Sequence, residues 1–392
     1  MTKIEKRILD FVKRNYIVIF FISLTIVGVL MRFSGRNFKS GDFNTFLSNW
    51  YDVIKQNGQL LCLRYQVGNY NVLYQTLIAL LTYVPLDPLY AYKVLSIAFD
   101  FSLAVASAMC IYEMAEERRL EKAVLVYSLV WTSLIVVFNS TFFAQADSIY
   151  TSFIVWGLFF LSKKRNKTAF VCLGIAFAFK AQAVFILPFL CFLYVLNKQF
   201  SIMHIFLSVV VGWASSIPAI CYGRGWLDFF AIYGAQHAEL KNDMAINYPN
   251  FWVIVGGSYE NLQGIGVLLA TTVLGVGMYI LLCRQQVMDS YTKAMGLAVW
   301  TVWTVVMFVP GMHDRYGYLL EILLLCAVIF EARKYVLYAS GIYLTTIIAY
   351  ANFLFGKSHS LLPWATLYTV LYTLFTVRLF VIEMGRVEEY NG

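Results

Sequence analysis

Three clusters of polar residues interrupt an otherwise apolar stretch in the first half of the chain. The first holds Gln145 and Asp147, the second is the basic run 163–167, and the third holds Lys180 and Gln182. A basic run of this kind is typical of a cytoplasmic turn in a membrane protein. One apolar segment separates it from each of the other clusters, so these two are expected to meet on the opposite side. A carboxylate, an amide and a lysine would then share one water-facing level, which indicates a functional site because ionisable groups are costly there.

Asp42 lies just past the end of the first apolar segment, in the sequence Ser40-Gly-Asp-Phe-Asn. Two interpretations of Asp42 are open. Aspartate is a good N-cap, so Asp42 could begin an interfacial helix. A positioned carboxylate can also act as a general base that takes the proton of a hydroxyl group. The two roles are compatible.

His313, Asp314 and Arg315 stand together directly before an apolar segment. They could form a solvated ion pair in an aromatic belt at a helix end. A guanidinium at a water-facing helix start is also well suited to a phosphate, since its planar fork donates parallel hydrogen bonds. The spacing between Asp314 and Glu321 places both on one helical face. Glu321 is therefore expected to face the cavity and not the lipid.

The composition predicts an all-α, polytopic membrane protein in one integral-membrane domain. Of 392 residues, 60% are hydrophobic and 13% are charged, which excludes a soluble globular protein. The net charge of +8 comes from basic residues that are scattered between apolar segments, so no nucleic-acid partner is indicated. About twelve segments are expected to span the bilayer, and one of them contains Asp100, which is expected to pair with a neighbouring helix. These spans are 16–33, 89–112, 123–139, 147–162, 168–180, 183–196, 201–221, 261–283, 291–309, 317–332, 335–355 and 361–380.

The apolar segment 71–84 decides the topology, because it is shorter than the roughly 20 residues that cross the hydrocarbon. If this segment lies flat at the interface, the basic turns at 118–122, 163–167 and 284–293 all fall in the cytoplasm. If it spans, they all face outward, so we predict that it lies flat. Both termini are then cytoplasmic in a multi-pass protein of the cell membrane. The chain divides into an outer loop with interfacial helices, a catalytic helical core and C-terminal scaffold helices, over residues 34–88, 89–332 and 333–392.

The polar motifs resemble those of a known family. The runs Gln145-Ala-Asp-Ser-Ile-Tyr-Thr-Ser-Phe and Phe179-Lys-Ala-Gln-Ala-Val-Phe are similar to motifs of bacterial integral-membrane glycosyltransferases related to GPI mannosyltransferases, which belong to the C-type superfold. The resemblance extends over dispersed motifs from about Asp42 to Tyr318. It implies that a sugar, a hexose such as mannose, passes from a polyprenyl-phosphate donor to an acceptor glycan or lipid at the outer face of the membrane. The chain departs from the family at Asp314, where relatives usually have Glu, and in its lack of a Tyr-Pro-Pro-type stretch.

The resemblance also implies roles for individual residues. Asp42 is expected to be the general base. The donor phosphate is expected to contact Arg315, Lys180 and His313, although Lys180 could instead be a lysine that snorkels from a helix end. The residues expected to bind the sugar or the acceptor are Gln145, Asp147, Gln182, Asn250, Asp314 and Glu321. Asp42 and Asp147 could also hold a divalent cation, although no compact DxD pair is present.

Two other functions use a similar layout. A flippase of lipid-linked sugars would have a comparable cavity, but a transporter should show repeated halves, which this sequence does not. A glycan polymerase also has many spans and a large outer loop. It typically depends on arginines in that loop, where this chain has only Arg224 between Tyr222 and Glu260.

Overall fold

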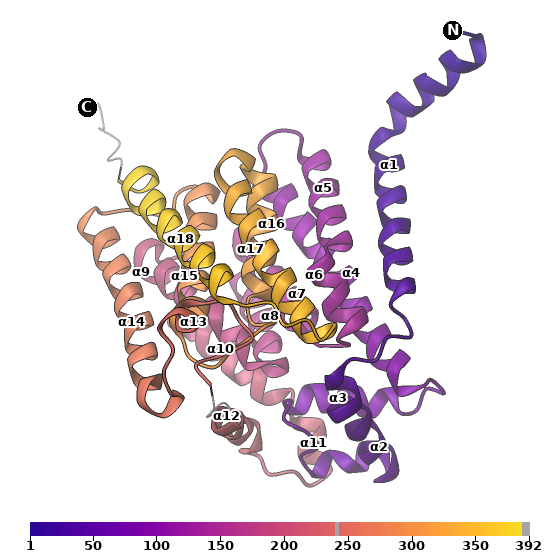
Figure 1. Ribbon diagram of the computed structural model, residues 1–392, viewed down its shortest axis with the longest axis vertical. Helices are drawn as coiled ribbons and strands as arrows, with labels where there is room; N and C mark the ends of the chain where they lie inside the picture. Colours follow the sequence, from indigo (N-terminus) through magenta and orange to yellow (C-terminus); the bar gives the residue numbers. More distant parts are fainter. Residues whose placement is uncertain (240–242, 386–392) are drawn as a thin grey trace.

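The computed structural model describes residues 1–239 and 243–385. These residues form a bundle of helices with a short two-stranded sheet (Figure 1). Within them, six helical segments are long and apolar enough to cross a membrane, or seven if the bent pair α5 (Arg119–Thr132) and α6–η3 (Leu134–Phe142) counts as one span. The protein is therefore an all-α membrane protein, as the composition predicts. The six are α1 (Lys3–Ser34), α4 (Pro88–Met114), α10–α11 (Ile202–Cys221), α14 (Tyr259–Cys283), α17 (Ala332–Leu354) and α18–η5 (Leu362–Glu383).

Every predicted span coincides with helical structure, but several helices are short. The apolar helices of 10–17 residues include α7, α8 and α16, and the helical stretch Ala181–Asn197 consists of the 3-10 helix η4 followed by α9. Pro188 lies in the first turn of α9 and so begins this helix instead of breaking it. The predicted count of about twelve spans is not confirmed, because six helical segments of the described chain have the length and hydropathy of a span. The bounds are α7 (Asp147–Ser162), α8 (Asn166–Phe179), η4 (Ala181–Ile186), α9 (Leu187–Asn197) and α16 (Tyr318–Phe330).

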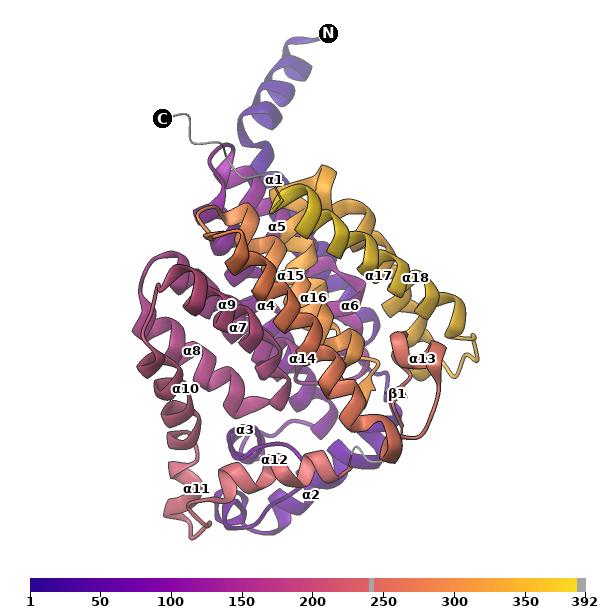
Figure 2. The same cartoon turned by 90° about the vertical axis from the view of Figure 1, so that its left-hand side faces the viewer.

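The segment that decides the topology is the helix α3 (Val72–Leu81), which has 10 residues. This length is far below the roughly 20 residues of a span. The helix is mostly buried and packs at one end of the bundle with α2 (Ser48–Gln56), α11 and α12 (Asp228–Glu239), as Figures 1 and 2 show. The length and place of α3 agree with the prediction that this segment does not span.

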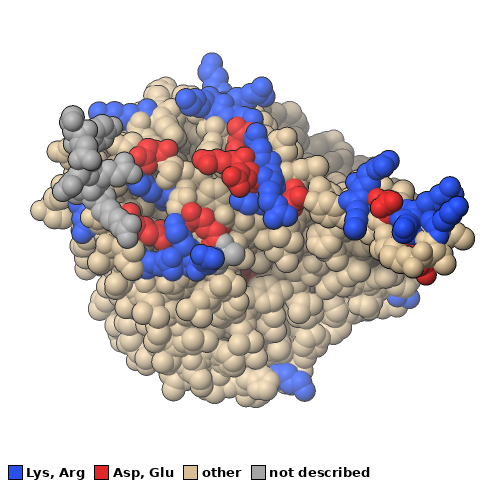
Figure 3. Space-filling model, turned by 90° about the horizontal axis from the view of Figure 1, so that it is seen from above, with Lys and Arg blue, Asp and Glu red and all other residues tan. Residues whose placement is uncertain are grey.

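The basic turns gather at the other end of the bundle. Glu113, at the end of α4, forms ion pairs with Arg119, at 3.5 Å, and with Lys163. The Asn197 Nδ2, at the end of α9, donates a hydrogen bond to the carbonyl oxygen of Met288 at 2.8 Å. Figure 3 shows the Lys and Arg side chains crowded on this face, where α1 begins and α18 ends (Figure 1). Further hydrogen bonds across this end join Asn166 with Gln199, Thr292 with Glu331, and Arg284 with Phe380.

The helix α15 (Tyr291–Phe308) forms the centre of the bundle. All its residues from Met295 to Phe308 are buried, and the Trp303 ring packs against four aromatic rings of α17 and α18. The helix therefore fixes the position of the loop 309–317 that follows it. At the periphery, Arg32 of α1 pairs with the buried Asp100 of α4 at 2.8 Å, which confirms that Asp100 pairs with a neighbouring helix.

Candidate functional site

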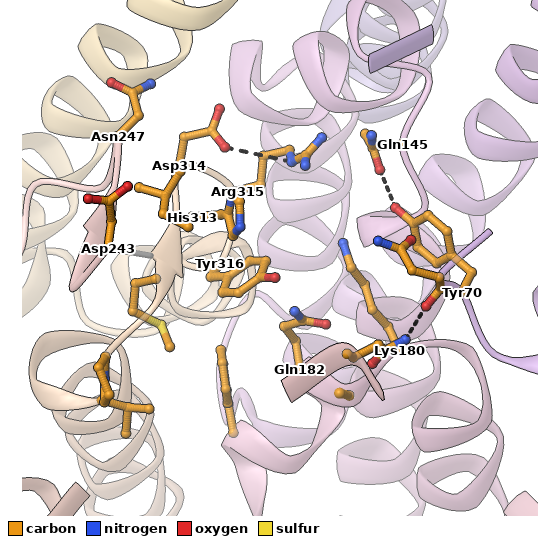
Figure 4. A pocket seen from close by; sticks show the side chains of 18 of the residues that line it. Tyr70, Gln145, Lys180, Gln182, Asp243, Asn247, His313, Asp314, Arg315 and Tyr316 are labelled. Carbon is orange, nitrogen blue, oxygen red and sulfur yellow. Dashed lines mark hydrogen bonds and ion pairs between the residues drawn. The ribbon is translucent and has the colours of Figure 1, made fainter. Parts of the chain in front are cut away.

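A cavity of about 990 Å³ lies at the end of the bundle opposite the basic turns. Figure 4 shows side chains that line it. Lys180 lines this cavity and directly follows the last residue of α8. The first residues of α8 lie at the basic end, so the cavity is at the opposite end of this helix. The walls come from segments far apart in the chain. They are η1 (Phe43–Leu47), the loop before α3, the turn before α7, η4, α14, and the strands β1 (Ala245–Ile246) and β2 (Met312–His313) with the turn after them.

Asp42 and Arg315 form the central contact of the cavity. The Arg315 Nη1 donates to the Asp42 Oδ2 at 2.6 Å, and the Gln145 Nε2 donates to the same oxygen at 2.8 Å. The Tyr70 hydroxyl in turn donates to the Gln145 Oε1. Burial raises the pKa of Tyr70 well above its ordinary value, so the phenol keeps its proton. The side chains of Arg315 and Asp42 are 12% and 17% exposed, so a ligand in the cavity can reach both.

Asp42 does not cap a helix. The helical stretch begins at Gly41, and the Ser40 Oγ accepts the hydrogen bond from the Phe43 backbone N–H at 3.1 Å. The Asp42 side chain makes no capping hydrogen bond. The capping interpretation of Asp42 is therefore wrong, and the carboxylate is directed at Arg315 and Gln145 instead.

Lys180 is buried and does not snorkel to the surface. Its Nζ contacts the Asp147 Oδ1 at 2.5 Å, and the other carboxylate oxygen accepts from the Asn139 Nδ2 at 2.8 Å. The ammonium group also lies 5.7 Å from the ring centre of Tyr70 and 5.9 Å from those of Tyr150 and Tyr316. The carboxylate and the aromatic faces around the Lys180 Nζ favour the charged form of the ammonium group.

Three of the residues predicted to bind sugar or acceptor are not part of the cavity wall. The Asp147 side chain is fully buried behind Lys180. Asn250 is also buried, where its Oδ1 caps α13 (Phe251–Val255) and its Nδ2 donates to the carbonyl oxygen of Val306. Glu321 was expected to face the cavity, but it is buried away from it, and its Oε1 accepts from Thr346 of α17. Asp314 precedes α16, so it does not share a helical face with Glu321. Asp147, Asn250 and Glu321 therefore lie behind the cavity wall, and their contacts with a ligand stay predictions.

Gln182, His313 and Asp314 do line the cavity, as predicted. Burial, with Arg315 nearby, lowers the pKa of His313 to about 4, so the imidazole is neutral near pH 7. Burial raises the pKa of Asp314 to about 7, against the opposing effect of Arg315. A neutral imidazole can donate or accept one hydrogen bond to a phosphate oxygen but adds no charge. Positive charge in this cavity therefore comes from Arg315 and Lys180.

Several residues of the cavity were not among the predicted site residues. Tyr70 holds Gln145, Trp50 packs against Tyr70, and Asp243 and Asn247 stand beside the turn 313–316. Tyr70 lies in the stretch Asn69-Tyr-Asn, at the place where the glycosyltransferases that this chain resembles often have a Tyr-Pro-Pro-type sequence. This difference is the one signal in the sequence that pointed to Tyr70. Asp243 and Asn247 reach the site through the pairing of β1 with β2, which two-residue strands do not reveal in the sequence.

Among the described residues, no three His, Cys, Asp or Glu side chains are grouped as a metal site. Asp42 and Asp147 each contact a different cation, and a divalent cation between them stays a prediction. Comparison of the chain with protein-family models and with curated proteins gave no match.

Proposed function

We propose that this protein is a glycosyltransferase that moves one sugar from a polyprenyl-phosphate donor to an acceptor glycan or lipid at the outer face of the membrane. The observation that carries the proposal is the cavity in which one carboxylate, Asp42, lies against Arg315, with Lys180 in the same wall. Transfer of a glycosyl group needs a base for the acceptor and positive charge for the leaving phosphate. The motifs that resemble C-type glycosyltransferases contribute Lys180 and Gln145 to the same cavity.

The chemistry follows from these side chains. The acceptor hydroxyl oxygen attacks the anomeric carbon while its proton passes to the Asp42 carboxylate. A carbon–oxygen bond forms to the acceptor, and the bond between the anomeric carbon and the phosphate oxygen breaks. The leaving polyprenyl phosphate takes the electron pair, and Arg315 and Lys180 stabilise its charge. His313 supplies a neutral hydrogen bond to the phosphate.

Because Asp42 is paired with Arg315, binding of the donor phosphate to Arg315 would also release Asp42. The donor phosphate competes with Asp42 for the Arg315 fork, to which it can bind through two oxygens. Once the phosphate occupies Arg315, the Asp42 carboxylate is released from the guanidinium and stays beside Gln145, where it is free to meet the acceptor hydroxyl. Donor binding thus prepares the base before the acceptor reacts.

The test is transfer in proteoliposomes that contain the purified protein and a polyprenyl-phosphate hexose with a radiolabelled sugar. Glycosyl transfer predicts label in an acceptor product, one sugar per acceptor, and loss of that product in Asp42→Asn. Movement of intact donor between leaflets without bond cleavage would identify a flippase and overturn the proposal. Long products made from lipid-linked oligosaccharide, with no use of the single-sugar donor, would identify a polymerase and overturn it equally.

A further inference from the structure

The cavity has two chemically different sides (Figure 4). Lys180, Gln145 and Tyr70 lie on one side, and Arg315 lies between the two. The other side carries Asp243, Asn247 and Asp314, and we call these three residues the acidic side. The division separates a region that suits a phosphate from one that would repel it.

The acidic side is built by the pairing of two distant segments. Strand β1 pairs in parallel with β2, with Ala245 opposite Met312 and Ile246 opposite His313. A hydrogen bond from the Gly311 N–H to the carbonyl oxygen of Met244, at 2.9 Å, extends this pairing. Asp243 before β1 and Asp314 after β2 are thereby held at the same wall. Two carboxylates from separate segments are placed in one cavity by backbone hydrogen bonds.

Asn247 is fixed in the same wall. Its φ of 55° is left-handed, a conformation that Asn adopts more readily than most residues. Its Nδ2 donates to the carbonyl oxygen of Ala349 in α17 at 2.8 Å. The side chain is therefore oriented by the scaffold in the absence of any ligand, and preorganised groups bind with a smaller loss of side-chain entropy.

Asp314 has an unmet hydrogen-bonding capacity that points to a ligand. The residue is only 3% exposed, and its Oδ2 has no hydrogen-bond partner in the described part of the chain. The neighbouring Arg315 Nε lies 3.7 Å from the other oxygen, Oδ1, which is too far for a hydrogen bond. A buried polar oxygen without a partner is costly. A hydroxyl or an ammonium group bound in the cavity would supply the missing donor.

We propose that the acidic side binds the acceptor, and that it selects an acceptor sugar that is neutral or carries an amino group over one that carries a carboxylate. The inference rests on the proposed function, in which the donor phosphate occupies Arg315 and Lys180. No cation then remains on the acidic side among the described lining residues to balance an anionic acceptor. Hydroxyl and ammonium groups donate hydrogen bonds to Asp243 and Asp314, whereas a carboxylate there faces Asp243 and, wherever Asp314 is ionised, a second like charge.

The test measures binding directly, so it does not depend on transfer. Radiolabelled phenyl glucoside, phenyl glucosaminide and phenyl glucuronide are titrated against the protein in nanodiscs with polyprenyl phosphate present to occupy Arg315 and Lys180. We expect the glucuronide to bind about tenfold more weakly than the other two, a difference typical of one repelled charge. Asp243→Asn and Asp314→Asn should each reduce that ratio to about threefold or less. Asp289→Asn, an exposed residue of the basic end, is the matched control and should leave the ratio unchanged.

Equal or tighter binding of the glucuronide, or a ratio that both variants leave unchanged, would overturn the inference. The same result follows if none of the three glycosides binds. Asp243 is exposed, so its replacement keeps the test valid if the buried Asp314→Asn variant does not fold. The proposed function is judged separately by the transfer assay. A protein that discriminates the glycosides but consumes no polyprenyl-phosphate sugar would refute the transferase and leave the selective site standing.

Discussion

At the scale of single residues, Ser40 provides the helix cap in the structure, and the proposed role of base is left to Asp42. The sequence could not show whether Asp42 caps a helix or acts as a base. Asp42→Asn keeps the size of the side chain and the Ser40 cap but cannot accept a proton. We expect turnover to fall about 100- to 10,000-fold, with donor binding retained or tightened because the neutral amide competes less with the phosphate for Arg315. Ser40→Ala is the matched variant. It removes the cap of Phe43 and should cost about 1 kcal/mol of stability, while a folded protein retains the chemical step.

Single-turnover rates and thermal unfolding of the two variants separate the loss of the base from the loss of the cap. Near-native turnover in a folded Asp42→Asn protein would show that the carboxylate is not the base. The base would then have to be sought at Asp314, since Asp147 is fully buried.

Asp314 provides a prediction about pH. Burial raises its pKa from 3.8 to about 7, so the folded state favours the protonated acid. This contribution to stability is present below pH 4 and is lost as pH rises through about 7. Between pH 5 and pH 8, the stability of the wild-type protein should therefore fall more steeply than that of Asp314→Asn. Thermal unfolding of both proteins across this range measures the difference, and parallel curves would show that Asp314 does not titrate there.

The residues of the site were predictable where their polarity conflicted with an apolar context. Lys180, Gln182 and Arg315 stand out for this reason, and they line one cavity. The same criterion failed for Asn250 and Glu321, because an intramembrane polar group can equally cap a helix or form a hydrogen bond with a side chain of another helix. Spacing along the chain does not tell these uses apart, since the partner comes from a distant segment.

At the scale of helices and strands, the Lys180–Asp147 pair joins the start of α7 to the break between α8 and η4. Lys180→Met leaves a buried carboxylate without its cation and should cost about 3–5 kcal/mol. Asp147→Asn leaves the ammonium unpaired and should cost a similar amount. The double variant removes both charges, so we expect it to recover most of the stability while donor binding stays weak. A double variant that also restores donor binding would show that Lys180 is structural only.

The positions of the helices could be predicted from apolar length, whereas the breaks could not. The run 123–139 was expected to be one straight span, but α5 and α6–η3 meet at Ser133 with a bend of 43°. The run 201–221 is likewise divided into α10 (Ile202–Ala214) and α11 (Ile217–Cys221). Each break lies within an apolar run, so apolar length alone does not mark it. Pro218 in α11 begins the second helix, which is the one local cue.

At the scale of the whole molecule, the length of α7 sets the depth of the cavity. The helix has 16 residues and is about 24 Å long. The hydrocarbon layer is about 30 Å thick, so a helix that starts at one boundary ends several ångströms short of the other. If the basic end of α7 lies at one boundary of the hydrocarbon layer, Asp147 and Lys180 would lie several ångströms inside the other boundary, where charges must be paired. A lipid-linked donor could reach this level with its phosphate while its chain stays in the bilayer.

The charge distribution leads to the prediction on topology. The basic turns at 118–122, 163–167 and 284–293 gather at the end opposite the cavity, so the positive-inside rule predicts that this end faces the cytoplasm and that the cavity faces outward. The protein has seven cysteines, and single cysteines are introduced after they are removed. Arg165 is exposed at the basic end, and Ser358 is exposed in the loop after Phe353, a residue of the cavity wall.

An impermeant thiol reagent applied to intact cells should label Ser358→Cys and should label Arg165→Cys only after permeabilisation. These positions are chosen because a cysteine at the fully buried position 147 would not react. Labelling of Arg165→Cys in intact cells would invert the topology. A cavity that opens to the cytoplasm would then exclude transfer at the outer face, even if the chemistry of Asp42 and Arg315 is correct.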